Sequence, residues 1–279
     1  MQIASGFHSS FDQSKIYFQR WQQSHSKATV IVTHGQAEHI GCYQRLIDAL
    51  LELPVDVIAW DMRGHGKSDG SRGYAAHFQD YIRDFEGLLG KLTTDMRLME
   101  KPIFLIAHSM GALVQFKTLC EKPGLPIAGQ ILSGPLFGLA MQVPALKDMA
   151  AQWIEQLVPK LTLGNEILPE RLTRDLDVLR EFDNDPLRHN RISATVYLGS
   201  LRAASEVRAM ASRVETPTLL LMAENDPITS VTNAKEVFEK IGAQDKTAIY
   251  YPERMHEIFN DIGRDQVFKD LRSWIGAKI

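Results

Sequence analysis

The sequence predicts an α/β fold, in which helices cover both faces of a mostly parallel β-sheet. Short apolar runs with the composition of buried strands alternate with longer segments whose apolar residues recur at helical spacing. Most of the runs are mainly apolar and do not alternate with polar residues, as expected for strands that are buried on both faces. Alternation of such strands with helices is typical of a parallel sheet, because each parallel connection needs a crossover.

The expected elements follow from this pattern in chain order. An early strand over residues 15–21 pairs in a hairpin with residues 5–10. Further strands are expected over 28–33, 55–60, 102–107, 127–133, 217–223 and 247–251, and helices over 43–53, 78–93, 231–241 and 266–275. In the helix over 78–93, for example, Tyr81, Phe85 and Leu88 recur on one face, so we expect this face to pack on the sheet.

Residues 136–212 interrupt the alternation of strands and helices. Two segments with helical spacing, the first with apolar residues from Leu146 to Leu161, flank a charged stretch. Such an interruption is typical of an insertion between two strands of one sheet. We therefore expect a core formed by residues 1–135 and 213–279, and a mainly helical cap inserted over 136–212.

The composition is that of a globular protein whose core needs no disulfides. The chain has 279 residues, of which 44% are hydrophobic and 23% charged, and a formal net charge of −3. This charge argues against nucleic acid as a partner, and the sequence has no run of about 20 apolar residues that could span a membrane. Cys42 and Cys120 are too few for a disulfide framework, and residues 1–20 have no long apolar stretch, so we do not expect them to form a signal peptide. We expect reduced thiols and a cytoplasmic location.

Residues 107–111, Ala-His-Ser-Met-Gly, carry the strongest chemical signal in the chain. Ser109 stands between an expected strand and an expected helix, with small residues two before and two after it. A tight strand-to-helix turn needs those small residues, because larger side chains would collide where strand and helix nearly touch. The pattern resembles the nucleophile elbow of α/β-hydrolases, in which a strained serine projects its Oγ out of the sheet.

The acid and the base of such a site come from loops after later strands, in the order Ser, acid, His. His256 follows the last expected strand and is the only histidine beyond residue 189, so it is the one candidate for the base. The loop after strand 217–223 offers Glu224 and Asp226. We favour Asp226, because it sits on the loop proper, whereas Glu224 lies nearer the end of the strand.

Two backbone N–H groups are expected to form an oxyanion hole for the developing negative charge. One belongs to Met110, and the other to Gln36 in the loop after strand 28–33. The chain has many histidines, but no His-Glu-x-x-His pair and no cysteine cluster, so we expect no metal and no other cofactor. The Gly-rich residues 61–68 lack the full phosphate-binding spacing, and we interpret them as a tight turn beside the site.

Several motifs together resemble the monoacylglycerol lipase and lysophospholipase family of the α/β-hydrolases. They are His34-Gly35-x-x-Glu38-His39, Arg63-Gly64-His65-Gly66-x-Ser68, His108-Ser109-Met110-Gly111, the run from Asp183 to Leu187, Asn225-Asp226 and Met255-His256. The resemblance therefore spans most of the chain. Two departures stand out: Ala107 replaces the usual first glycine of the elbow, and Gln36-Ala37 replaces an Ala-Gly pair.

The resemblance implies Ser109, Asp226 and His256 as a catalytic triad. It also implies the amides of Gln36 and Met110 as the oxyanion hole. A lipid ester is the implied substrate. The side chains expected to contact this substrate are those of Glu38, His39, Met141 and Leu146.

These residues predict a serine hydrolase that cleaves fatty acid esters through an acyl-enzyme. Monoacylglycerol is the substrate that the resemblance favours, and lysophospholipids or general carboxylic esters are the alternatives. Thioesters and amides are weaker candidates, and an intact triad argues against a binding protein without activity. An apolar cap would also let the enzyme rest on a membrane or micelle.

Overall fold

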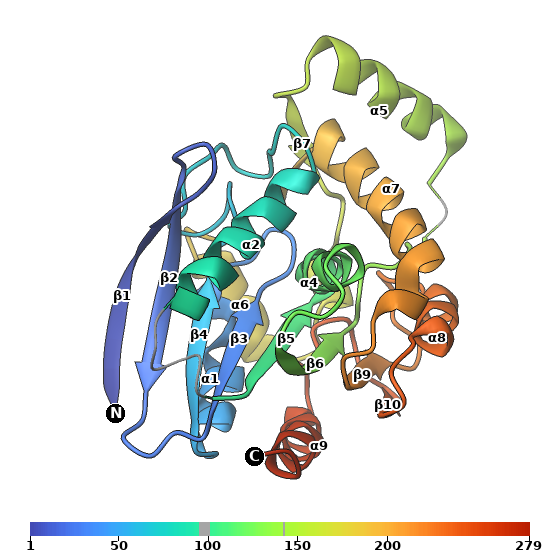
Figure 1. Cartoon of the computed structure of the whole chain (residues 1–279). Helices are drawn as coiled ribbons and strands as arrows, with labels where there is room; N and C mark the ends of the chain where they lie inside the picture. The colour runs from blue at the N-terminus through green and yellow to red at the C-terminus, as the bar shows by residue number, and fades with distance from the viewer. Residues whose placement is uncertain (95–100, 142) are drawn as a thin grey trace.

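A mostly parallel sheet forms the centre of the computed structural model, which describes residues 1–94, 101–141 and 143–279 (Figure 1). Eight strands of the described part lie in the order β1-β2-β4-β3-β5-β6-β9-β10. The first two pairings, β1 with β2 and β2 with β4, are antiparallel, and the rest are parallel. The strands are β1 (Gln2–Ser9), β2 (Lys15–Gln22), β3 (Ala28–Thr33), β4 (Val55–Trp60), β5 (Ile103–His108), β6 (Ile127–Ser133), β9 (Thr218–Ala223) and β10 (Lys246–Tyr251).

Helices cover both faces of this sheet. On one face lie α1 (Gln44–Leu51), which follows a short 3-10 turn η1 (Ile40–Tyr43), and α9 (Arg264–Gly276). On the other face lie α2 (Gln79–Thr94), α4 (Ser109–Glu121), α7 (Ala194–Met210) and α8 (Val231–Lys240). Strands β3, β4, β5 and β9 are buried along their whole length, in keeping with their mainly apolar composition. The predicted fold class is confirmed.

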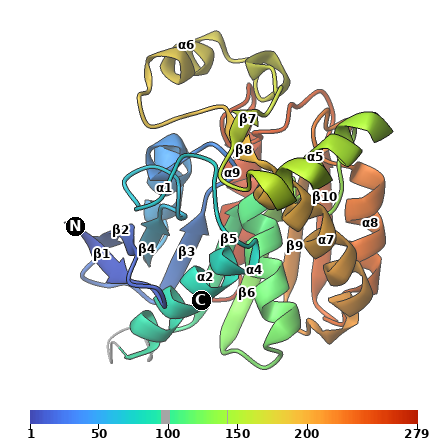
Figure 2. The same ribbon diagram turned by 90° about the horizontal axis from the view of Figure 1, so that it is seen from above.

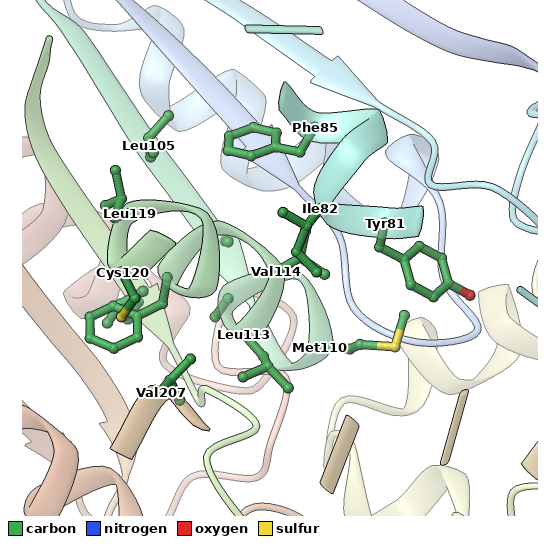
Figure 3. Close-up of a cluster of buried hydrophobic side chains, with 14 of the residues drawn as sticks. Tyr81, Ile82, Phe85, Leu105, Met110, Leu113, Val114, Leu119, Cys120 and Val207 are labelled. Carbon is green, nitrogen blue, oxygen red and sulfur yellow. The ribbon is translucent and has the colours of Figure 1, made fainter. Parts of the chain in front are cut away.

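Helix α4 lies at the centre of the second face, and nearly all of its residues are buried. Its side chains meet those of α2 and α7 in one apolar cluster, in which Leu113 and Val114 have no exposed surface (Figure 3). Even its polar Gln115 is buried, and its Nε2 donates to Thr33 Oγ1 on β3 at 2.8 Å. This packing holds the start of α4, where Ser109 lies, in one position relative to the sheet.

The segment predicted as a cap contains α5 (Ala145–Leu157), β7 (Thr162–Gly164), η2 (Pro169–Arg171), α6 (Leu176–Asn184), β8 (Arg191–Ser193) and α7. Seen from above, α6 lies over the α1 side of the sheet and α5 over the α7 side (Figure 2). Helix α7 buries Val196, Ala203 and Val207 in the core cluster, whereas α5 lies on the outer side of α7. The α7 part of the segment therefore packs on the core, and the division at 136 and 212 stays a prediction.

None of the helices in the described ranges is long and apolar enough to cross a membrane.

Candidate active site

Ser109 lies on a strained turn at the carboxyl end of β5, in the middle of the sheet. Its φ is 51°, a left-handed backbone conformation that side chains rarely adopt. The turn packs so closely on the loop after β3 that a Cβ added at Gly111 would lie 2.2 Å from the carbonyl oxygen of His34. The small residue at position 111 is therefore required by the contact between elbow and loop, as the sequence pattern predicted.

His256 lies between Ser109 and Asp226 in one hydrogen-bonded chain. Its Nε2 is 3.0 Å from Ser109 Oγ, and its Nδ1 is 2.7 Å from Asp226 Oδ2. All three side chains are buried. With Nδ1–H donating to the carboxylate, Nε2 is the free acceptor for the serine proton, and this is the geometry that a general base needs.

Asp226 is fixed in place by the loop after β9. Its Oδ1 accepts the N–H groups of Ile228 and Thr229 at 2.8 and 2.9 Å. Burial alone would raise the pKa of this carboxyl, but the charge and hydrogen bond of His256 and the two N–H groups hold the pKa below its ordinary value. Glu224 is exposed and does not reach the histidine, so the structure brings Asp226, and not Glu224, to His256.

The loop after β3 lies directly against the elbow. A Cβ added at Gly35 would lie 3.3 Å from Ser109 Cβ, and Ala37 has a φ of 67°. Met110 is in the first turn of α4, where N–H groups have no intrahelical partner and can receive an oxyanion. Gln36 uses its side chain elsewhere: Nε2 donates to the Arg191 carbonyl at 2.7 Å, and Oε1 accepts from Asn165 at 2.9 Å. Its backbone stays in the loop beside Ser109.

Two further histidines flank the site and are held neutral. The ring centre of His108 lies 4.5 Å from that of His256. His34 accepts the Met62 N–H at 2.9 Å and so braces the loop after β3. Burial lowers the pKa of His34 and of His108 to about 3 each. Neither ring therefore adds a positive charge next to His256 near neutral pH.

A cavity of about 310 Å³ opens above Ser109 and His256. Its apolar wall includes Ile167, Leu172 and Phe182, and its polar wall includes Gln36, Glu38, Asp183, Asn165, Arg188 and Asn190. Of the side chains expected to contact substrate, Glu38 lines this cavity. His39 does not, because its Nε2 lies 2.6 Å from Asp185 Oδ2 and joins the loop to the end of α6.

Met141 and Leu146 lie outside this cavity, contrary to the sequence prediction. Both side chains are exposed, and Leu146 has 76% of its surface accessible. Helical spacing identified an apolar face correctly, but it does not tell which side of the cap faces the serine. The apolar wall comes instead from residues 167–182, in the stretch that the sequence shows mainly as charged.

Sequence reasoning missed the buried ion pair of Arg188 and Glu257, which lines the same cavity. Glu257 directly follows the candidate base His256, and this position in the chain was the one feature of the sequence that could have pointed to it. Its partner is 69 residues away in the chain, so no local pattern joins the two.

One group in the described residues has the spacing of a metal site: ligand atoms of His39, Cys42 and Asp185 all lie within 4.8 Å of one another. The Arg188 guanidinium is 3.5 Å from the Cys42 sulfur. Burial raises the pKa of this thiol, so the neutral form is favoured. A nearby cation and a protonated thiol both oppose binding of a metal ion.

A serine on a strained turn at the end of a central parallel strand, joined to a histidine and an aspartate, defines the class of protein: a serine hydrolase with the α/β-hydrolase fold. Comparison with known proteins gives the family. Residues 24–263 match the family described as serine aminopeptidase, S33. The chain belongs to this family and is an ester hydrolase.

Its relatives include lipases and a phospholipase. The chain is 30% identical over 271 residues to a monoglyceride lipase homolog of Monkeypox virus, with 96% of each protein covered. It is 28% identical to phospholipase YtpA of Bacillus subtilis (strain 168), over 91% of this chain and 97% of that protein. Among solved structures, the monoacylglycerol lipase of Paleococcus ferrophilus superposes with a TM-score of 0.85 at 26% identity, over 95% of this chain and 99% of the other.

Proposed function

We propose that Ser109, His256 and Asp226 are the catalytic triad of an enzyme that hydrolyses fatty acid esters, with monoacylglycerol as the preferred substrate. The observation that carries the proposal is the chain of contacts from Ser109 Oγ through His256 to Asp226, at 3.0 and 2.7 Å. His256 takes the serine proton as Oγ attacks the ester carbonyl, and it then protonates the leaving alcohol. A water molecule activated by the same histidine releases the fatty acid from the acyl-enzyme.

The N–H groups of Gln36 and Met110 stabilise the oxyanion in this proposal. Met110 N–H points out of the start of α4, and the helix dipole favours negative charge there. The Gln36 side chain, bonded to the Arg191 carbonyl, holds the loop so that its backbone stays beside Ser109.

The substrate class is supported by the two walls of the cavity and by the relatives. Ile167, Leu172 and Phe182 provide apolar surface for an acyl chain, and Asn165 and Asn190 provide polar groups for an alcohol. Monoglyceride lipases and a phospholipase both occur among the relatives, so a lysophospholipid is the second candidate substrate.

We also propose that the outer face of α5 rests on the surface of a membrane or micelle. Leu146, Met149, Trp153 and Leu157 are all exposed there. A large exposed apolar patch marks an interaction site, and Trp beside Leu is typical of a helix that lies in the lipid interface.

The unpaired cysteines Cys42 and Cys120 are consistent with the cytoplasmic location expected from the sequence.

One experiment tests the reaction and the substrate together. The purified enzyme is labelled with a fluorophosphonate, the labelled peptide is identified by mass spectrometry, and fatty acid release is measured from 1-monoacylglycerol, lysophosphatidylcholine and an aminoacyl amide. We expect the label on Ser109 and the highest kcat/KM for monoacylglycerol. A label on another residue would contradict the triad, and faster release from lysophosphatidylcholine would establish the second candidate.

A further inference from the structure

Three charged side chains meet in a buried cluster beside the site, and each comes from a different segment. Arg188 belongs to the loop between α6 and β8, Glu257 follows His256, and Glu38 lies in the loop after β3. Arg188 Nη2 is 2.9 Å from Glu257 Oε1, and Nη1 is 3.9 Å from Glu38 Oε1. The three side chains are only 11%, 3% and 4% exposed, in that order.

Each carboxylate of the cluster is tied to a loop of the proposed catalytic site. Glu38 Oε2 accepts hydrogen bonds from Gly35 N and from Tyr43 Oη, each at 2.6 Å. Glu257 adjoins His256 in the chain, and its Oε2 accepts from Asn260 Nδ2 at 2.8 Å. A shift of either carboxylate therefore moves the backbone that carries an oxyanion donor or the base.

Arg188 is held in place from two sides. Its Cζ lies 3.5 Å from the ring centre of Phe182, at the end of α6, and its Nη atoms point toward the carboxyl groups of Glu257 and Glu38. Burial and the charge of Glu257 raise the pKa of Glu38 to about 8, so near neutral pH the cluster holds one proton, one carboxylate and one guanidinium. The charge of Glu257 is compensated only while Arg188 stays in place.

We propose that Arg188 is a positioning residue for ester hydrolysis: it links the segment around α6 to the loops that carry the oxyanion donor Gln36 and the base His256. This inference rests on the proposed triad. Arg188 supplies the buried counter-charge for Glu257, and a buried carboxylate without one is driven to move toward water or to take up a proton. Movement of the segment around α6 thus changes the geometry at Ser109, although Arg188 itself does not contact the reacting atoms.

The test is a charge-rescue series. Arg188→Met removes the cation, Arg188→Lys keeps it, and Glu257→Gln removes the partner charge alone or together with Arg188→Met. Arg45→Met is the matched control, because Arg45 also joins the core to α6, through Glu181 at 2.6 Å, but at the exposed surface. For each folded variant we measure kcat and KM for a short soluble ester, and the rate of fluorophosphonate labelling.

We expect Arg188→Met to lower kcat by about 10- to 100-fold with little change in KM, since small misplacements of catalytic groups cost up to about 100-fold. The double variant should recover much of that loss, Arg188→Lys should retain most activity, and Arg45→Met should match wild type. If Arg188→Met does not fold, we compare kcat of the double variant with kcat of Glu257→Gln alone. Equal values support the proposal, and a lower kcat for the double variant contradicts it.

A change confined to KM would overturn the proposal and make Arg188 a substrate contact. A folded double variant as slow as Arg188→Met would also overturn it, because packing and not charge would then account for the loss. Failure of the proposed function looks different: wild-type enzyme would not be labelled at Ser109 at all.

Discussion

Helices α4 and α5 both have 13 residues and both carry two or more leucines, but they differ in what covers them. Leu113 on α4 has no accessible surface, whereas Leu157 on α5 is 73% exposed. Helix α4 packs between the sheet, α2 and α7, and α5 has contact mainly with α7. The comparison shows that an apolar face predicts burial only where the fold supplies a second surface.

The same contrast separates the proposed catalytic groups from the residues that we propose to contact the substrate. Ser109 and the elbow are fixed by the packed core, while residues 165–191 reach the site through a few polar contacts, such as His39 with Asp185 and Gln36 with the Arg191 carbonyl. Packed interiors resist displacement, and polar surface contacts do so less. We therefore expect substitutions at core positions to affect every ester alike.

The largest effect should come from Ser109→Ala. Loss of the nucleophile in such triads lowers kcat by about 10⁶-fold. The variant should fold normally and lose activity on short and long esters to the same extent, as measured by kcat and by thermal unfolding. Near-normal turnover by a folded variant would exclude Ser109 as the nucleophile.

Asp226→Asn should lower kcat by about 10⁴-fold, because the amide leaves His256 in the wrong tautomer and does not support its positive form. Glu224→Gln is the matched control, since this side chain is exposed on the same loop. We expect it to retain nearly full kcat. The reverse result, an active Asp226→Asn and an inactive Glu224→Gln, would mean that the loop rearranges in solution.

The same leucine-to-alanine change in the two helices tests the comparison directly. Leu113→Ala should lower the free energy of unfolding by about 2–5 kcal/mol, because it leaves a cavity in the core. Leu157→Ala should change it by about 0.5 kcal/mol or less. Urea unfolding of both variants measures the difference, and a large loss for Leu157→Ala would show that another surface covers α5 in solution.

Acid should destabilise the core through its neutral histidines. The pKa of His108 is lowered to about 3 in the folded protein, below the ordinary value of 6.5, so the unfolded chain binds more protons between these two pH values. The contribution of neutral His108 to the free energy of unfolding is therefore fully present above pH 6.5, and it is lost as the pH drops toward 3. Each such histidine adds a slope of about 1.4 kcal/mol per pH unit. Urea midpoints at pH 7 and pH 5 should differ less for His108→Asn than for wild type.

The sequence predicted the core well, since its strands and helices differ from the observed bounds by only one or two residues in most cases. Strand 28–33 and β3 coincide, and the predicted helix 78–93 is observed as α2 at Gln79–Thr94. Mainly apolar runs and a glycine at position 111 reflect local constraints, and local constraints can be recognised in a sequence. The choice of Asp226 over Glu224 followed from loop position alone and agrees with the geometry at His256.

The cap could not be predicted to the same depth. Met141 and Leu146 were expected at the substrate and are exposed, because a periodic pattern defines a face and not its partner. The contact of Arg188 with Glu257 depends on how the chain returns to the site, and a charged residue in a charged stretch is most often solvated. Pairs of residues that are this far apart in the chain can be identified only once the fold is known.

The Arg188–Glu257 pair also limits how this enzyme can exchange parts with its relatives. A recombination break point anywhere between positions 188 and 257 takes the guanidinium from one parent and the carboxylate from the other. A hybrid that inherits Glu257 without a cation at position 188 keeps an uncompensated buried charge, which costs about 3–5 kcal/mol of stability. Libraries of hybrid lipases built on this chain should therefore transfer both positions together, even though they lie in different segments.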